Sequence, residues 1–185
     1  RELSDKTGLT RGAIRRCKLL IELPEEYQQE ILKELHKPKS QQKLSEDFFI
    51  EMERALKTVE RAMPEIIDNK DAVRRILIDK YKKETIKSVT EFRQIGKIAR
   101  ASYVEADENK ARNALRKLFH VNDYSIANAW EQSVAEAYAE RDLLTRIHSM
   151  LELIKYVDRD ELDEEVKNAL RSLIRRAKKL LEGEG

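Results

Sequence analysis

Residues 3–28 read LSDKTGLTRGAIRRCKLLIELPEEYQ, and the breakers and caps in this run constrain how the chain can fold. Gly8 is suited to the left-handed turn that commonly ends a helix. Thr10 is a favourable N-cap for a second helix over residues 10–21. Pro24 suits the start of a third helix, because two glutamates follow it in the first turn. The run therefore predicts helices joined by tight turns.

Four apolar side chains in this run have the spacing of a helix-turn-helix: Leu3, Leu9, Ile14 and Cys17. Ile14 and Cys17 are three residues apart, so they lie on one helix face. We expect this face to pack against the first helix, with Cys17 as a small core residue. The same spacing also suits an ordinary helix pair with a solvated basic face.

The opposite face of the second helix carries residues suited to DNA. The predicted DNA-binding set consists of Lys6, Thr10, Arg11, Gly12, Arg15, Arg16 and Lys18. Arginine binds guanine through two hydrogen bonds or contacts phosphate, and a glycine allows close approach of the backbone. Thr10, at a helix start, can contact phosphate together with backbone N–H groups. In a helix-turn-helix this helix enters the major groove, and a dimer binds two half-sites.

The same run resembles the helix-turn-helix region of ParB-like chromosome and plasmid partition proteins. Its most distinctive part is residues 23–26, where the second helix leads into Leu-Pro-Glu-Glu, and residues 43–46, which open a later helix, are also similar. The resemblance covers about residues 1–60 and at most residues 1–100. It implies sequence-specific binding of double-stranded DNA through the same helix face. It also implies a role in partition, nucleoid organisation or transcriptional regulation, at the nucleoid in the cytoplasm.

Proteins of that family normally carry a nucleotide-binding domain just before this region. This sequence begins inside the motif, so we expect it to be a segment of a longer protein and do not carry over the family's CTP chemistry. No cofactor is expected. Lys18 stands where the family more often has an apolar residue. Residues 123–185 do not resemble the family's usual dimerisation element.

Composition favours an all-α fold. The chain has 185 residues, of which 41% are hydrophobic, enough for a core. Its 5 Gly and 3 Pro are about a third of average usage, which disfavours a loop-rich fold. There is no apolar run of the length that a membrane span needs, and no signal segment follows Arg1. One cysteine cannot form an internal disulfide or a zinc site, which fits a reducing compartment such as the cytoplasm.

We expect three segments along the chain. Residues 1–62 form the helix-turn-helix DNA-binding region, residues 63–122 a helical middle segment with a basic surface, and residues 123–185 a hairpin of long helices that is a candidate for dimerisation. Within them, the helices are expected at about 10–21, 24–36, 45–63, 71–83, 90–101, 107–119 and 123–157, with a final helix after residue 160.

The last two helices carry heptad repeats of apolar residues. The repeats are Leu144, Ile147, Leu151 and Ile154, followed by Val166, Leu170, Leu173, Ala177 and Leu180. A three-residue turn between two apolar seams favours a hairpin within one chain. A contact between two chains is the alternative, and a homodimer is the expected assembly.

Formal charge is +2 overall, but residues 70–100 hold ten basic and four acidic residues. This block is a candidate accessory DNA surface whose cations would neutralise phosphates without recognising sequence. Its candidate residues are Arg74, Arg75, Lys82 and Lys83, together with Lys80 and Lys87. A helix face that simply contacts solvent explains the block equally well.

No catalytic pattern is present in the sequence. His36, His120 and His148 are far apart and lack metal-ligand spacing, and no glycine-rich phosphate loop exists. We expect neither an enzyme nor a metal site, and no small-molecule substrate. Trp130 and Tyr138 are expected in the core. The alternative function is a helical protein-interaction adaptor that self-associates through its heptads and binds no specific DNA.

Overall fold

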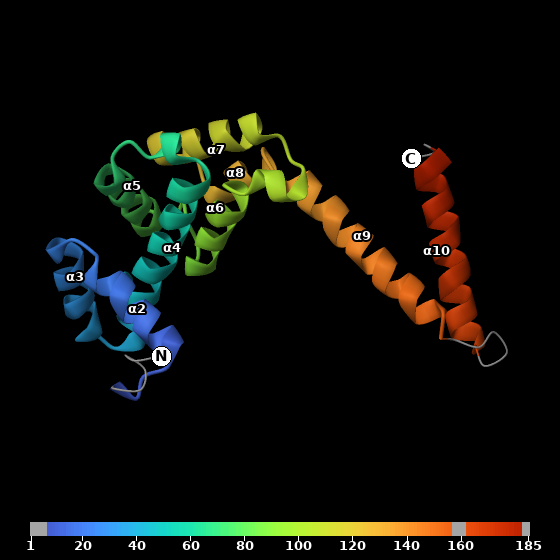
Figure 1. Cartoon of the computed structure of the whole chain (residues 1–185), viewed down its shortest axis with the longest axis horizontal. Helices are drawn as coiled ribbons and strands as arrows, with labels where there is room; N and C mark the ends of the chain where they lie inside the picture. Colours follow the sequence, from blue (N-terminus) through green and yellow to red (C-terminus); the bar gives the residue numbers. More distant parts are fainter. Residues whose placement is uncertain (1–6, 157–161, 183–185) are drawn as a thin grey trace. The chain divides into compact units, whose positions relative to one another are not determined.

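The computed structural model describes residues 7–156 and 162–182, and their regular secondary structure is entirely helical (Figure 1). The predicted all-α fold is confirmed. The α-helices are α2 (Arg11–Ile21), α3 (Glu25–Leu35), α4 (Glu46–Ala62), α5 (Lys70–Lys82), α6 (Phe92–Ile98), α7 (Glu108–His120), α8 (Ile126–Glu131), α9 (Ala135–Ile154) and α10 (Glu164–Glu182). Short 3₁₀ turns lie at Lys39–Gln41, Pro64–Ile66, Val89–Glu91 and Ala101–Val104.

The chain divides into two compact units, Arg1–Ala139 and Glu140–Gly185, called unit 1 and unit 2 below. Both expected segment boundaries, after residues 62 and 122, fall inside unit 1. Helices from both sides of each boundary contribute to one hydrophobic core. The core therefore joins the expected DNA-binding region to the middle segment.

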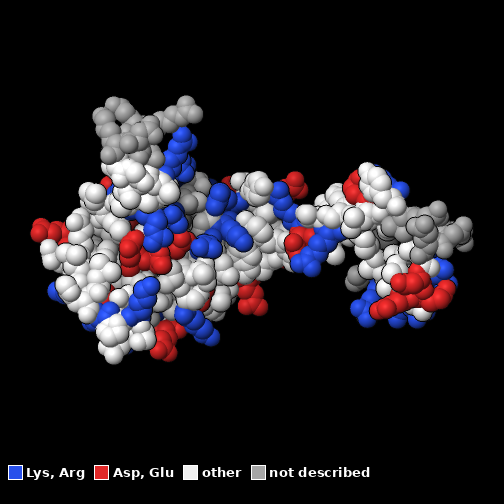
Figure 2. Space-filling model, turned by 90° about the horizontal axis from the view of Figure 1, so that it is seen from below, with Lys and Arg blue, Asp and Glu red and all other residues white. Residues whose placement is uncertain are grey.

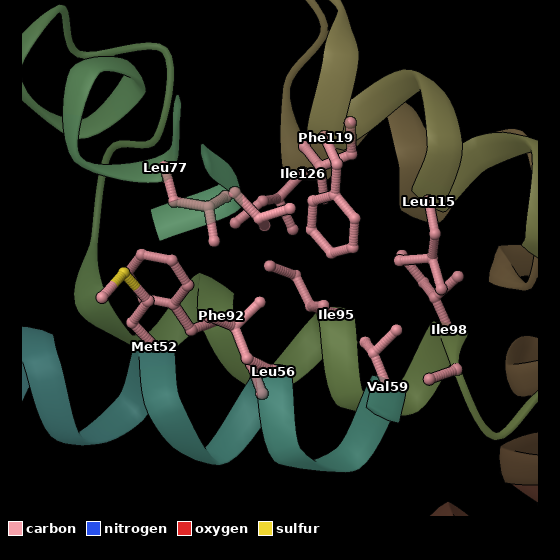
Figure 3. Packing of buried hydrophobic residues seen from close by; sticks show 14 of the residues in the cluster. Met52, Leu56, Val59, Leu77, Phe92, Ile95, Ile98, Leu115, Phe119 and Ile126 are labelled. Atoms are coloured by element: carbon pink, nitrogen blue, oxygen red, sulfur yellow. The ribbon is translucent and has the colours of Figure 1, made fainter. Parts of the chain in front are cut away.

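α4 and α6 form the centre of that core (Figure 3). Met52 and Leu56 of α4 point toward Phe92 and Ile95 of α6, and all four side chains are fully buried. α5, α7 and α8 add buried side chains from the other side of α6. Full burial of each large apolar side chain contributes about 1.5–3 kcal/mol, so this cluster is the main source of stability in unit 1.

Most helix starts follow the local sequence. The side chains of Thr10, Ser45 and Asp107 accept hydrogen bonds from backbone N–H groups in the first turns of α2, α4 and α7, which confirms the Thr10 cap and the helix starts expected at residues 45 and 107. The helix start expected at residue 90 is wrong, because Thr90 is not the N-cap. Ser88 occupies that role in a capping box with Glu91, and α6 is shorter than expected.

The expected single helix over residues 123–157 is also wrong, because α8 ends at Glu131 and α9 begins at Ala135. The Ser133 hydroxyl donates to the carbonyl of Ala129, and such back-bonding bends helices. Val134, in the break, is buried in the core of unit 1. The burial of Val134 in the core therefore favours a turn between α8 and α9 over the continuous helix that the local sequence favours.

Arg74 does not lie on the surface expected for an accessory DNA contact. Its guanidinium is buried and binds Glu53 of α4 through Nε–Oε1 at 2.7 Å and Nη2–Oε2 at 3.0 Å. Burial alone would lower the pKa of Arg74, but hydrogen bonds to Glu53 and Asp71 outweigh burial and raise it. This two-bond ion pair joins α5 to α4 inside unit 1, and a cation so placed cannot reach a phosphate.

Lys80 is likewise buried rather than on the basic surface expected of it. Its Nζ donates to the carbonyl of Val121 at 2.6 Å and to the carbonyl of Tyr124. These bonds join α5 to the loop between α7 and α8. Burial lowers the pKa of Lys80 to about 8, although Asp123 opposes the shift. Lys80 therefore acts as a structural cross-link.

Replacing Arg74 by Met should destabilise unit 1 by about 3–5 kcal/mol, because Glu53 would remain buried without its partner. The double variant Glu53→Met/Arg74→Met should recover most of the loss. Urea unfolding followed by circular dichroism measures both. Arg75→Met, at the exposed neighbouring position, is the control and should change stability by less than about 1 kcal/mol. Equal losses in the Arg74 and Arg75 variants would contradict the structural role of the pair.

Lys80 should make stability depend on pH in the alkaline range. Between its folded pKa of about 8 and its ordinary value of 10.5, the unfolded chain holds more protons than the folded one. The free energy of unfolding should therefore rise with pH across this window, by about 3 kcal/mol at most. Urea titrations of wild type and Lys80→Met from pH 7.5 to 10.5 measure the difference. Parallel curves for the two proteins would show that the lysine is not the cause.

Candidate nucleic-acid interface

α2 begins at a sharp turn built as the sequence indicates. Gly8 has φ +67°, in the left-handed region, and a Cβ at this position would meet no atom within 4 Å. The Thr10 hydroxyl accepts from the backbone N–H of Ala13 at 3.2 Å. The first turn of α2 holds no acidic side chain. The partial positive charge of this helix start is therefore not neutralised within α2 itself.

α2 lies beside α4 (Figure 1), and ion pairs toward both ends of α4 hold the two helices together. Nη2 of Arg16 lies 3.0 Å from Oε1 of Glu46 and 2.7 Å from Oδ1 of Asp47, both in the first turn of α4. Hydrogen bonds to these two carboxylates raise the pKa of Arg16. At the other end, Lys57 Nζ lies 2.5 Å from Oε2 of Glu22. Contrary to expectation, Arg16 thus contacts α4 and is not a free DNA-facing cation.

The remaining predicted residues of α2 share its exposed face. Arg11, Gly12, Arg15 and Lys18 are all exposed, and Thr10 lies beside them at the helix start. Arg11 and Arg15 form no ion pair with any residue in the described ranges. Lys18 Nζ lies 3.8 Å from a Glu22 oxygen, a weak surface pair. Lys6 falls outside the described residues.

The expected apolar packing of α2 is only partly present. Cys17 is exposed and Leu9 is 45% exposed, whereas Ile14 is half-buried; Leu3 lies outside the described residues. The prediction that Cys17 is a core residue is wrong. On α2, Arg16 binds α4 and Leu20 packs against the core, whereas the neighbouring Cys17 is exposed.

A second cationic feature is a cavity of about 300 Å³ beside the end of α5. Lys43, Lys82 and Lys87 line this three-lysine cavity together with one acidic residue, Glu84, and none of the lysines forms an ion pair within the described part of the chain. Lys43 lies two residues before Ser45, the N-cap of α4. The first turn of α4 also forms the ion pair with Arg16. Sequence reasoning did not select Lys43, because this loop residue is about forty positions away from the other two.

The other accessory candidates are dispersed. Lys83 is exposed but does not line the three-lysine cavity. Arg75 lines a different cavity that also holds Glu26, Glu30 and Asp79, and its Nη2 lies 3.9 Å from Oε1 of Glu26. That cavity has no net cationic character. Of the accessory candidates, Lys82 and Lys87 therefore lie in a cluster of lysines without ion pairs among the described residues.

Lys and Arg are mixed with Asp and Glu over the face drawn in Figure 2. That face is therefore not a continuous basic surface. Attraction for a polyanion would come from local groups, namely the exposed face of α2 and the three-lysine cavity. Exposed pairs such as Arg146–Asp142 are screened by salt and add little to a long-range field.

Trp130 and Tyr138 lie partly buried at the edge of the core. Their ring centroids are 4.8 Å apart, and Lys97 Nζ lies over both rings at 5.6 and 5.4 Å. This cation–π contact joins α6 to α8 and α9 within unit 1. A structural role accounts for both aromatic residues.

Comparison with protein-family models, with curated proteins and with solved structures finds no match for this chain. Within residues 7–156 and 162–182, no group of three or more His, Cys, Asp or Glu side chains is arranged to hold a metal ion. None of the described helices combines the length and apolarity needed to cross a membrane.

Proposed function

We propose that this chain binds double-stranded DNA through the exposed face of α2, as a ParB-like helix-turn-helix protein. One observation carries the proposal: Arg11 and Arg15 stand exposed and without a carboxylate partner in the described residues, while the neighbouring Arg16 is bound to α4. Arg11 and Arg15 are four residues apart, so both side chains extend from one side of the helix. Two arginines so placed can reach the same groove.

Each residue of this face has a distinct role in the proposal. Arg11 and Arg15 contact base edges or phosphates, and Thr10 contacts a phosphate at the helix start. Gly12 lets the DNA backbone approach α2 closely, since its Cβ position is open apart from Thr10 Oγ1 at 3.8 Å. Arg16 fixes the orientation of α2 on α4. The three-lysine cavity adds phosphate contacts that are independent of sequence.

The biological process follows from the resemblance to ParB-like proteins. We propose a role in chromosome or plasmid partition, nucleoid organisation or related regulation, exerted at the nucleoid in the cytoplasm. A homodimer binding two half-sites fits this role, because one recognition helix covers only a short sequence.

The double variant Arg11→Ala/Arg15→Ala should weaken DNA binding by about tenfold or more, because each good arginine–base contact is worth about 1–3 kcal/mol. Selection of bound duplexes from a random pool provides the probe, and fluorescence anisotropy at low salt measures its affinity. Arg61→Ala/Arg116→Ala removes the same charge from α4 and α7 and is the matched control. Equal losses in both double variants, or no loss in either, would refute recognition by α2.

Gly12→Ala should separate stability from binding. Alanine in place of a helical glycine should raise the free energy of unfolding by about 0.5–1 kcal/mol. If the DNA backbone approaches Gly12 as proposed, the added methyl group should nevertheless lower affinity for the selected duplex. Thermal unfolding and anisotropy measure the two effects. Unchanged affinity in the stabilised variant would mean that DNA does not approach at Gly12.

The adaptor function is a second proposal, favoured by the exposed apolar side chains of unit 2. The two functions differ in their response to salt. Phosphate contacts make affinity fall steeply as ionic strength rises, whereas association through apolar surface does not weaken in this way. An adaptor without DNA binding would yield no enriched duplex from the random pool.

A further inference from the structure

The cavity that Arg75 lines, called the α3–α5 cavity below, has a volume of about 300 Å³. Residues of two helices and of the segment that starts α4 line it. The helix residues are Glu26, Tyr27 and Glu30 of α3, and Arg75, Ile78 and Asp79 of α5. Residues three and four positions apart share a helix face, so α3 and α5 each turn one face toward the same space. The volume falls at the lower end of the range for small-ligand pockets.

The buried part of the cavity lining is largely apolar. Tyr27, Leu44, Phe49 and Ile78 line the cavity, and each is more than nine-tenths buried. The ring centroids of Tyr27 and Phe49 are 5.8 Å apart. All four side chains also belong to the hydrophobic core of unit 1, which holds them in place. Methylene groups of a ligand would therefore contact an apolar surface that is already formed.

The Tyr27 hydroxyl is the polar group within this apolar lining. It is buried, and it has no hydrogen-bond partner among the described residues. Burial raises the pKa of Tyr27, and the nearby Arg75 opposes the rise without completing a hydrogen bond to the hydroxyl. A buried polar group without a partner destabilises a fold, and most such groups in proteins are paired. A ligand with an N–H group could donate to the Tyr27 oxygen.

Carboxylates lie on both helix walls of the cavity. Glu30 of α3 and Asp79 of α5 form no ion pair with any described residue. Glu26 is 3.9 Å from Arg75, and both side chains are more than half exposed, so this pair is weak. Lys82 lines the three-lysine cavity as well as this one. The lining therefore has three carboxylates and two cations, and its two carboxylates without ion pairs belong to different helices.

This arrangement favours a ligand with positive charge at both ends and an aliphatic middle. One ammonium group would pair with Glu30 and the other with Asp79. The methylene groups between them would contact the apolar lining. An ammonium group can also donate to the Tyr27 oxygen, because a protonated hydroxyl still accepts. A dicarboxylate of the same length would place like charges beside Glu30 and Asp79.

We propose that the α3–α5 cavity binds an aliphatic diamine or polyamine, with its ammonium groups on Glu30 and Asp79 and an N–H group donating to Tyr27. The methylene chain lies against Phe49 and Ile78. The amine is bound as a ligand and is not a substrate. This inference does not depend on DNA binding, since no residue of α2 lines the cavity.

Isothermal titration calorimetry of the full chain at low ionic strength tests the site. Cadaverine, a five-carbon diamine, should bind at one site per chain, whereas glutarate, a five-carbon dicarboxylate, should not. Absence of cadaverine binding would overturn the proposal. Tighter binding of glutarate would overturn it as well, because the cations of the lining would then determine which ligand is bound.

Removal of the two carboxylates without ion pairs locates the amine. Glu30→Gln/Asp79→Asn should raise the dissociation constant of cadaverine about fivefold or more, since both ammonium groups lose a partner. Glu131→Gln/Glu136→Gln removes the same charge from exposed positions in α8 and α9 and is the matched control. Circular dichroism checks that both variants are folded. Equal losses in the two variants, or no loss in either, would overturn binding in this cavity.

Tyr27→Phe tests the hydroxyl separately from the carboxylates. Because this hydroxyl has no partner in the fold, its removal should leave the thermal unfolding temperature unchanged or raise it. The dissociation constant of cadaverine should nevertheless rise about threefold or more, because a hydrogen bond to the ligand is lost. A lower unfolding temperature, or unchanged affinity, would overturn the assignment of the Tyr27 hydroxyl to the amine.

Discussion

The packing of α4 against α6 is the interaction on which the rest of unit 1 depends. α4 buries one side in the centre of the core, and Glu53, also buried on α4, holds α5 through Arg74. The first turn of α4 then holds α2 through Glu46 and Asp47. The proposed DNA-binding helix is therefore positioned by a helix that is itself fixed by burial. A rigid support of this kind is what precise recognition of a groove requires.

Basic residues have different roles in this chain, because some are bound inside the fold and others are exposed at its surface. Arg74 and Lys80 lie inside unit 1 and hold helices together, and each buried cation is matched by carboxylates or carbonyls that offset its desolvation. Arg16 lies at the surface but is bound by two carboxylates. Arg11 and Arg15 form no ion pair within the described ranges, and they are the residues proposed to contact DNA. A count of positive charge along the sequence cannot separate these groups.

The two units bury apolar surface in different ways. Unit 1 encloses its apolar residues within one chain, around α4 and α6. Unit 2 presents its apolar residues on exposed helix faces. In the proposed homodimer, two copies of α2 act together on DNA. Dimerisation would then supply the second half-site contact that a single α2 cannot make.

Local features of the fold were accessible from the sequence because the atoms that create them are neighbours along the chain. The turn at Gly8, the caps at Thr10, Ser45 and Asp107, and the exposed face of α2 depend on groups within a few residues of one another. Other features depend on groups that are 20–45 positions apart. Arg15 and Arg16 are adjacent and identical in type, yet only Arg16 faces Glu46 and Asp47. Lys80 is buried only because the carbonyls of Val121 and Tyr124 fold back over α5. Pairing and desolvation arise from three-dimensional proximity, so the packing of distant segments, rather than local pattern, determined which cations of the described residues are bound inside the fold and which are exposed.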